Sequence, residues 1–345
     1  MKWAVTSPYF ESQTDRWISH AAASDRHSFT LVPRLGMDRN WHQSSSRADF
    51  KEWANRLRQS RSAFLDDEAG VITVFPQLAA SAGFWKVLER SDRPLVAWLF
   101  NTEGLNSSFK RVAARVPLAK VDRFVVHSTA EIAGYANLLR LPVERFEFVP
   151  LQFGGVVETG RPSGIDEPYV FATGSGYRDY ETFFAAVEKL GFRTLVLASD
   201  RVLAGLDIPP NVEILDQINR PAIRRLVRHA AVNVVPLNDE ALTAGLVTIV
   251  ETFRHGRSVV TTERLGLDDY CIDGKTALCA KLFDPVSMAD CIDLMWSDTA
   301  LRSSLDANAT AFAEENCTDM AAAMHLLRVL DGVTDGLRDG RHGRN

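Results

Sequence analysis

The stretch YVFATGSGYRDYETFFAAV, residues 169–187, decides the fold class of this chain. Its first four residues are apolar at consecutive positions, which is typical of a strand buried on both faces of a parallel sheet. A glycine turn follows, and then Phe183, Phe184 and Val187 recur at the spacing of an amphipathic helix. The stretch therefore predicts a buried strand that leads through a glycine turn into a helix.

The same alternation of short apolar runs and helical patterns extends over the whole chain. The expected strands are residues 3–6, 29–32, 71–75, 95–100, 124–126 and 146–149, and then 169–172, 194–198, 212–215, 232–235 and 258–261. Strands that alternate with helices predict an α/β chain with parallel sheets and right-handed crossovers.

The chain of 345 residues is long enough for two domains, and it divides near residue 152. LQFGGVVETGRPSGIDEP, residues 151–168, is rich in glycine, proline and charge, as linkers are. We expect a Rossmann-like domain at 1–152, a linker at 153–167, a second Rossmann-like domain at 168–320, and a helix and tail at 321–345.

The composition fits a soluble protein, with 46% hydrophobic and 24% charged residues. No apolar stretch approaches the roughly 20 residues that a membrane span needs. The N-terminal sequence MKWAVTSPYFESQTD lacks the apolar core of a signal peptide, and the four cysteines form no CxxC pair. We therefore expect a cytoplasmic protein with reduced thiols and no metal site.

The net charge of −5 is unevenly distributed along the chain. Residues 1–152 hold 20 Lys and Arg against 16 Asp and Glu, whereas the remaining residues hold 19 against 28. The basic half can face phosphates or an anionic membrane. Nucleic acid is not an expected partner, because the excess is small and no nucleic-acid-binding motif is present.

The glycine turn within the first stretch is a candidate phosphate site. Gly174, Ser175 and Gly176 can bring backbone amides to an anion at a helix N-terminus, with Tyr177 and Arg178 beside them. The arginine can offer a fork of two N–H groups to a diphosphate. A tight connection without a ligand is the alternative, since the third glycine of a dinucleotide-binding turn is missing.

A second candidate site lies in TAGLVTIVETFRHGRSVVTT, residues 243–262. The small residues Thr243, Ala244 and Gly245 precede a helix whose first amides have no partner within the helix. These amides and the helix dipole favour an anion.

Two polar residues of that helix, Thr248 and Glu251, are three residues apart and share a helix face. A carboxylate there can accept two hydrogen bonds from a vicinal diol such as ribose. The alternative is a solvated Glu251 that pairs with Arg254 or His255.

Residues 246–262 resemble the signature helix of GT-B glycosyltransferases, in which a glutamate binds the ribose of the sugar nucleotide. The elements of the family follow in order: the small-residue turn, Glu251, Gly256 at the helix end, and a strand around Val259. Further segments are similar to other parts of the same family: residues 121–150, 212–240 and 272–309.

The resemblance is closest to the family 4 type, glycosyltransferase group 1. It implies the GT-B fold, with two Rossmann-like doubly wound domains facing across a cleft. The first domain would bind the acceptor and the second the sugar nucleotide, with no other cofactor. It also implies a C-terminal helix that crosses back to the first domain.

The sequence departs from the family at several positions. Retaining members carry two glutamates with seven residues between them, and Thr243 stands in place of the first. SPYFESQTD, residues 7–15, replaces a glycine-rich loop, and Asn101 stands near the place of a histidine. Of the basic pair that family members usually carry behind the donor phosphates, only Arg178 is present. The stereochemical course of transfer stays open.

The sequence contains no DxD-type metal motif, so sugar transfer would depend on the protein's own charges. Arg178 and the backbone amides of the two turns would stabilise the departing nucleoside diphosphate. An inverting enzyme needs a carboxylate base, for which Glu103 is the first candidate, followed by Asp15 and Glu11. Each is otherwise an ordinary loop carboxylate. His127, at a strand end, either touches the acceptor or sugar or is a structural histidine.

Two segments of the first half, residues 47–65 and 108–120, set apolar side chains against several Lys and Arg. Such helices can lie on anionic lipid, which would indicate a lipid-linked acceptor and a peripheral location on the inner face of the membrane. The alternative is a helix whose apolar side faces the core.

These features together predict a hexosyltransferase-like glycosyltransferase. It would move a sugar from a nucleoside diphosphate sugar to a glycan, lipid-linked or other hydroxyl acceptor in bacterial polysaccharide or glycoconjugate assembly. Two alternatives stay open: an inactive GT-B partner that binds nucleotide or glycan, and a sugar-nucleotide epimerase.

Overall fold

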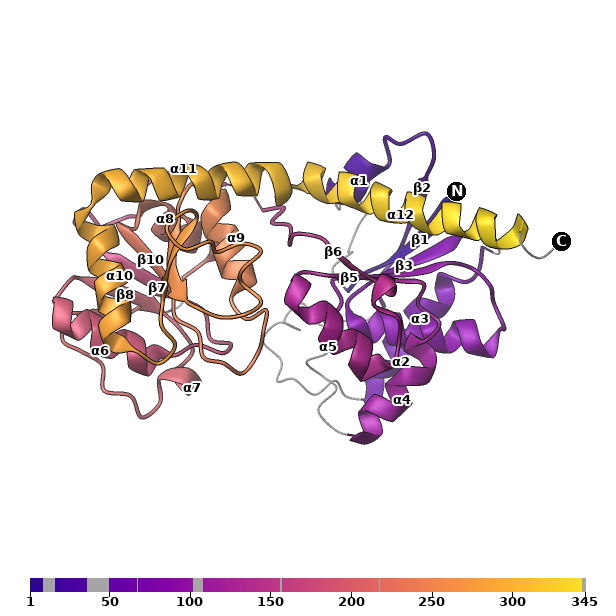
Figure 1. The fold of residues 1–345 in the computed structure, drawn as a ribbon, viewed down its shortest axis with the longest axis horizontal. Coiled ribbons are helices and arrows are strands. Elements are labelled where there is room, and N and C mark those ends of the chain that lie inside the picture. The colour runs from indigo at the N-terminus through magenta and orange to yellow at the C-terminus, as the bar shows by residue number, and fades with distance from the viewer. Residues whose placement is uncertain are drawn as a thin grey trace. The chain divides into compact units, whose positions relative to one another are not determined.

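The computed structural model describes residues 1–8, 16–35, 50–66, 68–101, 108–155, 157–216 and 218–342. The chain forms two compact units, which Figure 1 shows in the colours of the chain order. The first unit comprises Met1–Val149 and Asp319–Asn345, and the second comprises Pro150–Thr318.

The sheet of the first unit has six parallel strands in the order β2-β1-β3-β4-β5-β6. The chain runs outward from β1 to β2, crosses back to β3 and continues to β6, so the sheet is doubly wound. The strands are β1 (Lys2–Thr6), β2 (Ser28–Val32), β3 (Gly70–Val74), β4 (Leu95–Trp98), β5 (Arg123–Val126) and β6 (Phe146–Phe148).

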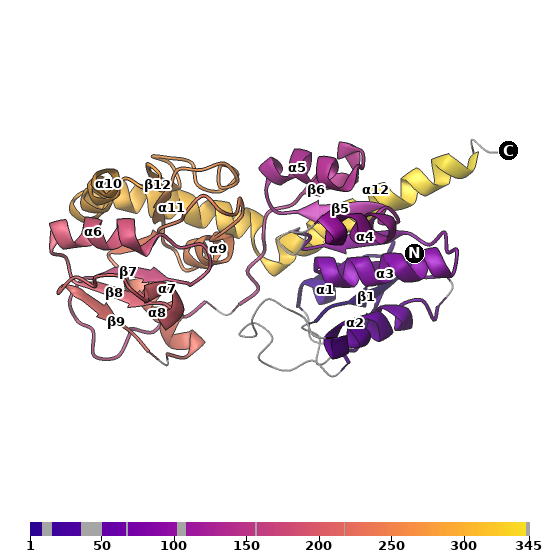
Figure 2. The same cartoon turned by 90° about the horizontal axis from the view of Figure 1, so that it is seen from below.

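One face of this sheet is covered by helices that connect successive strands. Figure 2 shows three of them side by side, with α3 between α2 and α4. These helices are α2 (Phe50–Ser62), α3 (Pro76–Leu88), α4 (Ser108–Leu118) and α5 (Thr129–Leu139), and a 3₁₀ turn, Val143–Arg145, leads into β6.

The opposite face carries α1 (Arg16–Ala21) and the long C-terminal helix α12 (Asp319–His342). Leu326 and Leu330 of α12 are fully buried against Trp3 and Ile72 of the sheet. Asp331 of α12 also accepts a hydrogen bond from buried His27 (2.9 Å) and pairs with Arg26 (3.0 Å). The end of the chain therefore completes the core of the first unit.

The sheet of the second unit also has six parallel strands, in the order β12-β11-β10-β7-β8-β9. The two units together confirm the predicted fold class of two doubly wound, Rossmann-like parallel sheets. The strands are β7 (Val170–Thr173), β8 (Thr194–Leu197), β9 (Val212–Ile214), β10 (Val232–Val235), β11 (Val259–Thr262) and β12 (Ala277–Ala280).

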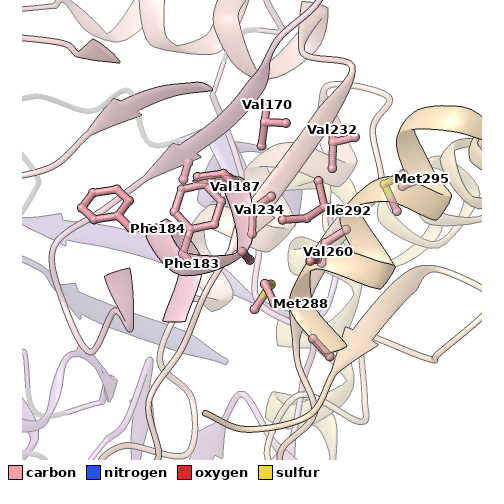
Figure 3. Close-up of a cluster of buried hydrophobic side chains, with 14 of the residues drawn as sticks. Val170, Phe183, Phe184, Val187, Val232, Val234, Val260, Met288, Ile292 and Met295 are labelled. Atoms are coloured by element: carbon pink, nitrogen blue, oxygen red, sulfur yellow. The ribbon is translucent and has the colours of Figure 1, made fainter. Parts of the chain in front are cut away.

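Helices α6 (Tyr180–Leu190) and α10 (Pro285–Ser297) cover one face of the second sheet. Figure 3 shows Phe183 and Ile292 from these helices meeting Val170 and Val234 from the strands. The strands are apolar at consecutive positions because their other side chains face α8 (Arg220–His229) on the opposite side. The remaining helices are α7 (Asp200–Leu203), α9 (Leu246–Arg254) and α11 (Thr299–Asn316).

Residues 153–167, which we expected as a linker, group with the second unit instead. Hydrogen bonds of the backbone fix the chain just before and at the start of this segment: Leu151 N donates to the Tyr270 hydroxyl (2.8 Å) and Phe153 N to Cys317 O (2.8 Å). The glycine and proline content of the segment indicated a flexible chain, but these anchors hold it to the folded unit.

The adjacent strands β7 and β10 form the switch point of the second sheet. The chain leaves β7 toward β8 and β9, then returns to β10 and continues to β11. The loops after β7 and β10 therefore run to opposite sides, and open α/β sheets bind ligands at such a point.

Candidate functional site

The loop after β7 begins with Gly174, which has a φ of 109°. A Cβ at this position would lie 2.5 Å from Nη2 of Arg178, so only glycine lets the arginine lie against the loop. Gly174 is also held in place, because its N–H donates to Leu197 O (3.1 Å) and its carbonyl accepts from the Tyr180 hydroxyl (2.7 Å).

Arg178 lies in the centre of the candidate site. Its Nη2 donates to Thr248 Oγ1 of α9 (3.0 Å), its Nη1 to Gly176 O (2.8 Å) and its Nε to Thr173 O (3.3 Å). Burial lowers the pKa of the guanidinium from its ordinary value. A guanidinium has five N–H donors, so about two remain beyond these three bonds.

The three acceptors of Arg178 are neutral, and the ion pairs among the described residues include no carboxylate for this arginine. A half-buried positive charge without a counter-charge carries part of the cost of removing a charge from water. The arrangement therefore suits an anion that arrives from outside the protein.

The loop after β10 forms the other side of the site. Arg178 and Leu237 form an isolated antiparallel bridge, and Asn238 N donates to Tyr177 O (3.1 Å). These contacts join the two loops of the switch point.

Helix α9 begins after Gly245, which has a φ of 83° and supplies no capping side chain. A Cβ at Gly245 would lie 3.0 Å from a methyl group of Leu237, so the backbone here approaches the neighbouring loop closely. The first amides of α9 and its dipole favour negative charge beside Thr248 and Arg178.

Glu251 lies one turn beyond Thr248 on α9. Its Oε1 accepts a hydrogen bond from Nε of Arg224 on α8 (3.0 Å), and both side chains are largely buried. The guanidinium of Arg224 also lies over the ring of Phe153, 5.2 Å from its centroid.

Neither of the two residues expected to pair with the Glu251 carboxylate does so. Arg254 pairs with Glu314 of α11, and the hydrogen bond from Nδ1 of His255 to Glu251 goes to its backbone carbonyl (2.7 Å). Helices α8 and α9 cover the same face of the sheet, which brings Arg224 to the carboxylate.

His255 is 1% exposed and joins α9 to the segment after Pro150. Its Nδ1 donates to Glu251 O, and its Nε2 accepts from Glu158 N (3.3 Å). Burial lowers the pKa of His255, which agrees with the neutral ring that this pair of bonds requires. The Phe153 ring packs edge-on against the imidazole, with centroids 5.7 Å apart.

The structure thus brings most of the predicted donor-site residues together. Ser175 Oγ accepts from Ser199 N (2.9 Å), and Thr243 and Ala244 lie in the turn before α9. The predicted residues around the switch point are Gly174, Ser175, Gly176, Tyr177, Arg178, Thr243, Ala244, Gly245, Thr248 and Glu251.

The predicted catalytic residues belong to the first unit. Glu103, Asp15 and Glu11 lie outside the described residues. His127 follows β5, where its Nδ1 donates to Val149 O (2.8 Å), and burial lowers the pKa of His127 to about 4.

Sequence reasoning missed Arg224 and Phe153 as neighbours of Glu251. The available signal was the pair Arg224 and Arg228, four residues apart on one face of α8. Arg228 uses the same face of α8 to donate to His255 O (3.2 Å).

Within the described part of the chain, no group of three or more His, Cys, Asp or Glu side chains is arranged to hold a metal ion. No described helix is both long enough and apolar enough to cross a membrane.

Comparison with protein families finds one match, which lies in the second unit. Residues 178–298 match the family model described as Glycosyl transferases group 1. The similarity to this family therefore lies within the second unit. The matched segment begins at Arg178 and contains Thr248 and Glu251, as well as Arg224. No curated protein matches the chain in sequence.

Solved structures show the fold of the chain. Sucrose-phosphate synthase from Thermosynechococcus elongatus superposes with a TM-score of 0.72 at 14% identity, over 97% of this chain and 100% of that one. Anabaena HepE in complex with UDP-glucose gives 0.70 at 14% identity, over 96% and 100%. A glycosyltransferase from Rickettsia africae gives 0.67 at 12% identity, over 96% and 98%. The chain has the GT-B fold that the sequence resemblance implied.

Proposed function

We propose that this chain transfers a hexose from a nucleoside diphosphate sugar to a hydroxyl group of a glycan or lipid-linked acceptor, without a metal ion. The match to the group 1 family model and the GT-B fold support sugar transfer. The structure of Anabaena HepE was solved with UDP-glucose, which supports a sugar nucleotide as the donor.

The observation that carries this proposal is the half-buried guanidinium of Arg178 with its neutral partners. A donor diphosphate would supply the missing negative charge. It would accept the remaining N–H groups of Arg178 and the first amides of α9, which lie next to Thr248. As the bond between the sugar and the phosphate breaks, charge grows on the diphosphate, and these donors stabilise it.

Glu251 would bind the ribose of the donor. Its Oε1 is held by Arg224, and the remaining lone pairs of the carboxylate would accept the ribose hydroxyls. The pairing with Arg224 fixes the direction of the carboxylate, so the arginine would act on the ribose through Glu251.

The reaction needs an acceptor oxygen to attack the anomeric carbon of the sugar while the nucleoside diphosphate leaves. The proton of that hydroxyl would pass to a base, for which Glu103 and then Asp15 are our candidates from the sequence. His127 is neutral and donates through Nδ1 to a backbone carbonyl, which supports a positioning role for its ring.

We propose bacterial polysaccharide or glycoconjugate assembly at the cytoplasmic face of a membrane as the setting. The support is the basic, amphipathic character of residues 47–65 and 108–120. A lipid-linked acceptor would be presented at such a surface.

An inactive GT-B partner is the second candidate, because Thr243 stands where retaining members carry a glutamate. Release of nucleoside diphosphate separates the two functions. A transferase releases the diphosphate from its sugar nucleotide when acceptor extract is added, with Glu251→Ala reducing the rate and Glu188→Ala, an exposed residue of α6, leaving it unchanged. Nucleotide binding without release under any acceptor would favour the inactive partner, and interconversion of the sugar nucleotide alone would favour an epimerase.

A further inference from the structure

Arg264 follows β11 and contacts the loop that follows the neighbouring strand β10. Its Nη1 donates to Asn238 O, and its Nη2 donates to Ala241 O. Its Nε is buried and has no hydrogen-bond partner in the part of the chain that the structure describes. The two terminal nitrogens of this guanidinium therefore hold the neighbouring loop at two backbone carbonyls.

We call residues 238–244 the β10 loop. Its first turn is closed by Asn238, whose Oδ1 accepts from Glu240 N (3.1 Å). Its last turn is closed by Ala244 N, which donates to Ala241 O (3.2 Å). The carbonyl of Ala241 therefore accepts both from Arg264 and from the turn that leads into α9.

Gly266 brings the backbone after β11 against the same loop. It has a φ of 96°, and a Cβ at this position would lie 2.3 Å from Leu242 O. Any larger residue would push the two loops apart. Arg264 and Gly266 thus fix the β10 loop at residues 238, 241 and 242.

The start of the β10 loop is tied to the loop that carries Arg178. Asn238 N donates to Tyr177 O (3.1 Å), while the carbonyl of Asn238 accepts from Arg264. The end of the β10 loop passes through Gly245 into α9, whose residue Thr248 accepts from Arg178. The arrangement of this loop therefore determines where the first amides of α9 lie relative to Arg178.

The geometry requires an arginine at position 264. Carbonyls of two different residues accept from one planar fork, whereas lysine offers all its donors from a single nitrogen. Burial lowers the pKa of Arg264, and the charge of Asp239 acts in the opposite direction. A lysine would keep the positive charge but would not bridge the two carbonyls.

The second unit contains another arginine that bridges two backbone carbonyls. Arg302 donates through Nη1 to Met295 O (3.0 Å) and Trp296 O (3.1 Å) at the end of α10. Arg264 and Arg302 are both half-buried. They differ in what they hold, because the loop held by Arg264 leads into the helix of the candidate donor site.

We propose that Arg264 is a positioning residue for the donor diphosphate, which it serves by holding the β10 loop so that the first amides of α9 lie beside Arg178. The inference rests on the proposed function and adds to it a residue that acts through the loop. The diphosphate itself would contact the amides and Arg178.

The test is calorimetric titration of the full chain with UDP, GDP and ADP, beside Arg264→Lys and Arg264→Met. If the β10 loop then holds its present arrangement only about a tenth of the time, the affinity for the diphosphate falls about tenfold. Arg264→Lys should lose affinity as well, because it keeps the charge without the fork. Hydrogen exchange without ligand should show a faster exchange of Ala244 N–H in both variants.

Arg302→Lys is the matched control, and it should bind the diphosphate like the unmodified chain. The nucleoside of the same base separates positioning from overall stability. It should bind the Arg264 variants as it binds the unmodified chain, since it has no phosphate to meet the amides of α9.

Full diphosphate affinity in Arg264→Lys would assign the effect to charge and overturn the proposal. An equal loss in Arg302→Lys, or an equal loss for the nucleoside, would assign it to overall stability and also overturn the proposal. Absence of diphosphate binding by the unmodified chain would overturn the proposed function together with this inference. Binding that the Arg264 variants leave intact would overturn this inference alone.

Discussion

Arg178→Met separates a ligand-binding arginine from a structural one. The change removes three hydrogen bonds to Thr173, Gly176 and Thr248, each of which contributes about 1 kcal/mol to the folded state. It also removes the cost of half-burying a guanidinium without a counter-charge, which is about 2–3 kcal/mol when the penalty for a fully buried ion is reduced for partial exposure. Because the two effects oppose each other, we expect the free energy of unfolding without ligand to change by less than about 1 kcal/mol.

Nucleotide binding, in contrast, should be strongly weakened by the same change. A hydrogen bond to a charged group contributes about 1.5–3 kcal/mol, and Arg178 retains about two donors for a diphosphate. A loss of about 3 kcal/mol in binding free energy corresponds to an affinity roughly 10²-fold weaker. Urea denaturation measures the first quantity, and calorimetric titration with nucleoside diphosphates measures the second.

Arg257→Met is the matched control for this experiment. Arg257 pairs with Asp306 (2.9 Å) away from the two loops, and both side chains are largely buried. The control should lose about 2 kcal/mol of stability, because it leaves a carboxylate without its cation, and it should bind nucleotide normally. The reasoning is refuted if Arg178→Met is destabilised as strongly as the control, or if its nucleotide affinity is unchanged.

Three further predictions follow from other parts of the structure. Arg224→Gln should weaken binding of a ribonucleoside diphosphate more than of its 2′-deoxy counterpart in calorimetric titration, because the arginine acts through the ribose-binding Glu251; equal losses would contradict this. His127 stays neutral in the folded chain, with a pKa of about 4, whereas the unfolded chain binds the proton near the ordinary value of about 6.5. The neutral His127 therefore contributes its full stabilisation above about pH 6.5, and this contribution is lost as the pH falls toward about 4. Urea denaturation should show a loss of about 2 kcal/mol in the free energy of unfolding between pH 7 and 5, and His127→Gln should flatten this pH profile. Asp306→Ala should cost about 3 kcal/mol in the same assay, since the carboxylate accepts bonds from Ser258 N and Oγ (both 2.7 Å) besides its ion pair. Asp306→Asn keeps an acceptor oxygen for Ser258 and should cost less; an equal cost would contradict the contribution of these two hydrogen bonds.

The strands were predictable because burial on both faces of a sheet requires apolar residues at consecutive positions. Val232–Val235 and Val259–Thr262 are rich in β-branched residues, and their positions followed directly from the sequence. Ala277–Ala280 was missed, because alanine and cysteine carry little preference for a strand. Its strand is defined by parallel pairing with β11, which the local sequence does not reveal.

The two loops of the switch point were also predictable, since Gly174 and Gly245 mark sharp turns between a strand and a helix. The pairing of Arg224 with Glu251 was not, because it depends on α8 and α9 lying together on one face of the sheet. For a similar reason the sequence left open whether the apolar side of α4 faces lipid or the core. Val112 and Val116 are exposed in the structure, and Arg115 donates to Leu138 O of a neighbouring helix.

The measurement that tests the central claim most directly is calorimetric titration of the unmodified chain with a panel of nucleoside diphosphates, beside Glu251→Ala and Glu188→Ala. The donor site at the β7–β10 switch point predicts that one diphosphate binds, that Glu251→Ala weakens this binding at least about tenfold, and that Glu188→Ala does not. Absence of binding by every diphosphate, or binding that Glu251→Ala leaves intact, would contradict the site.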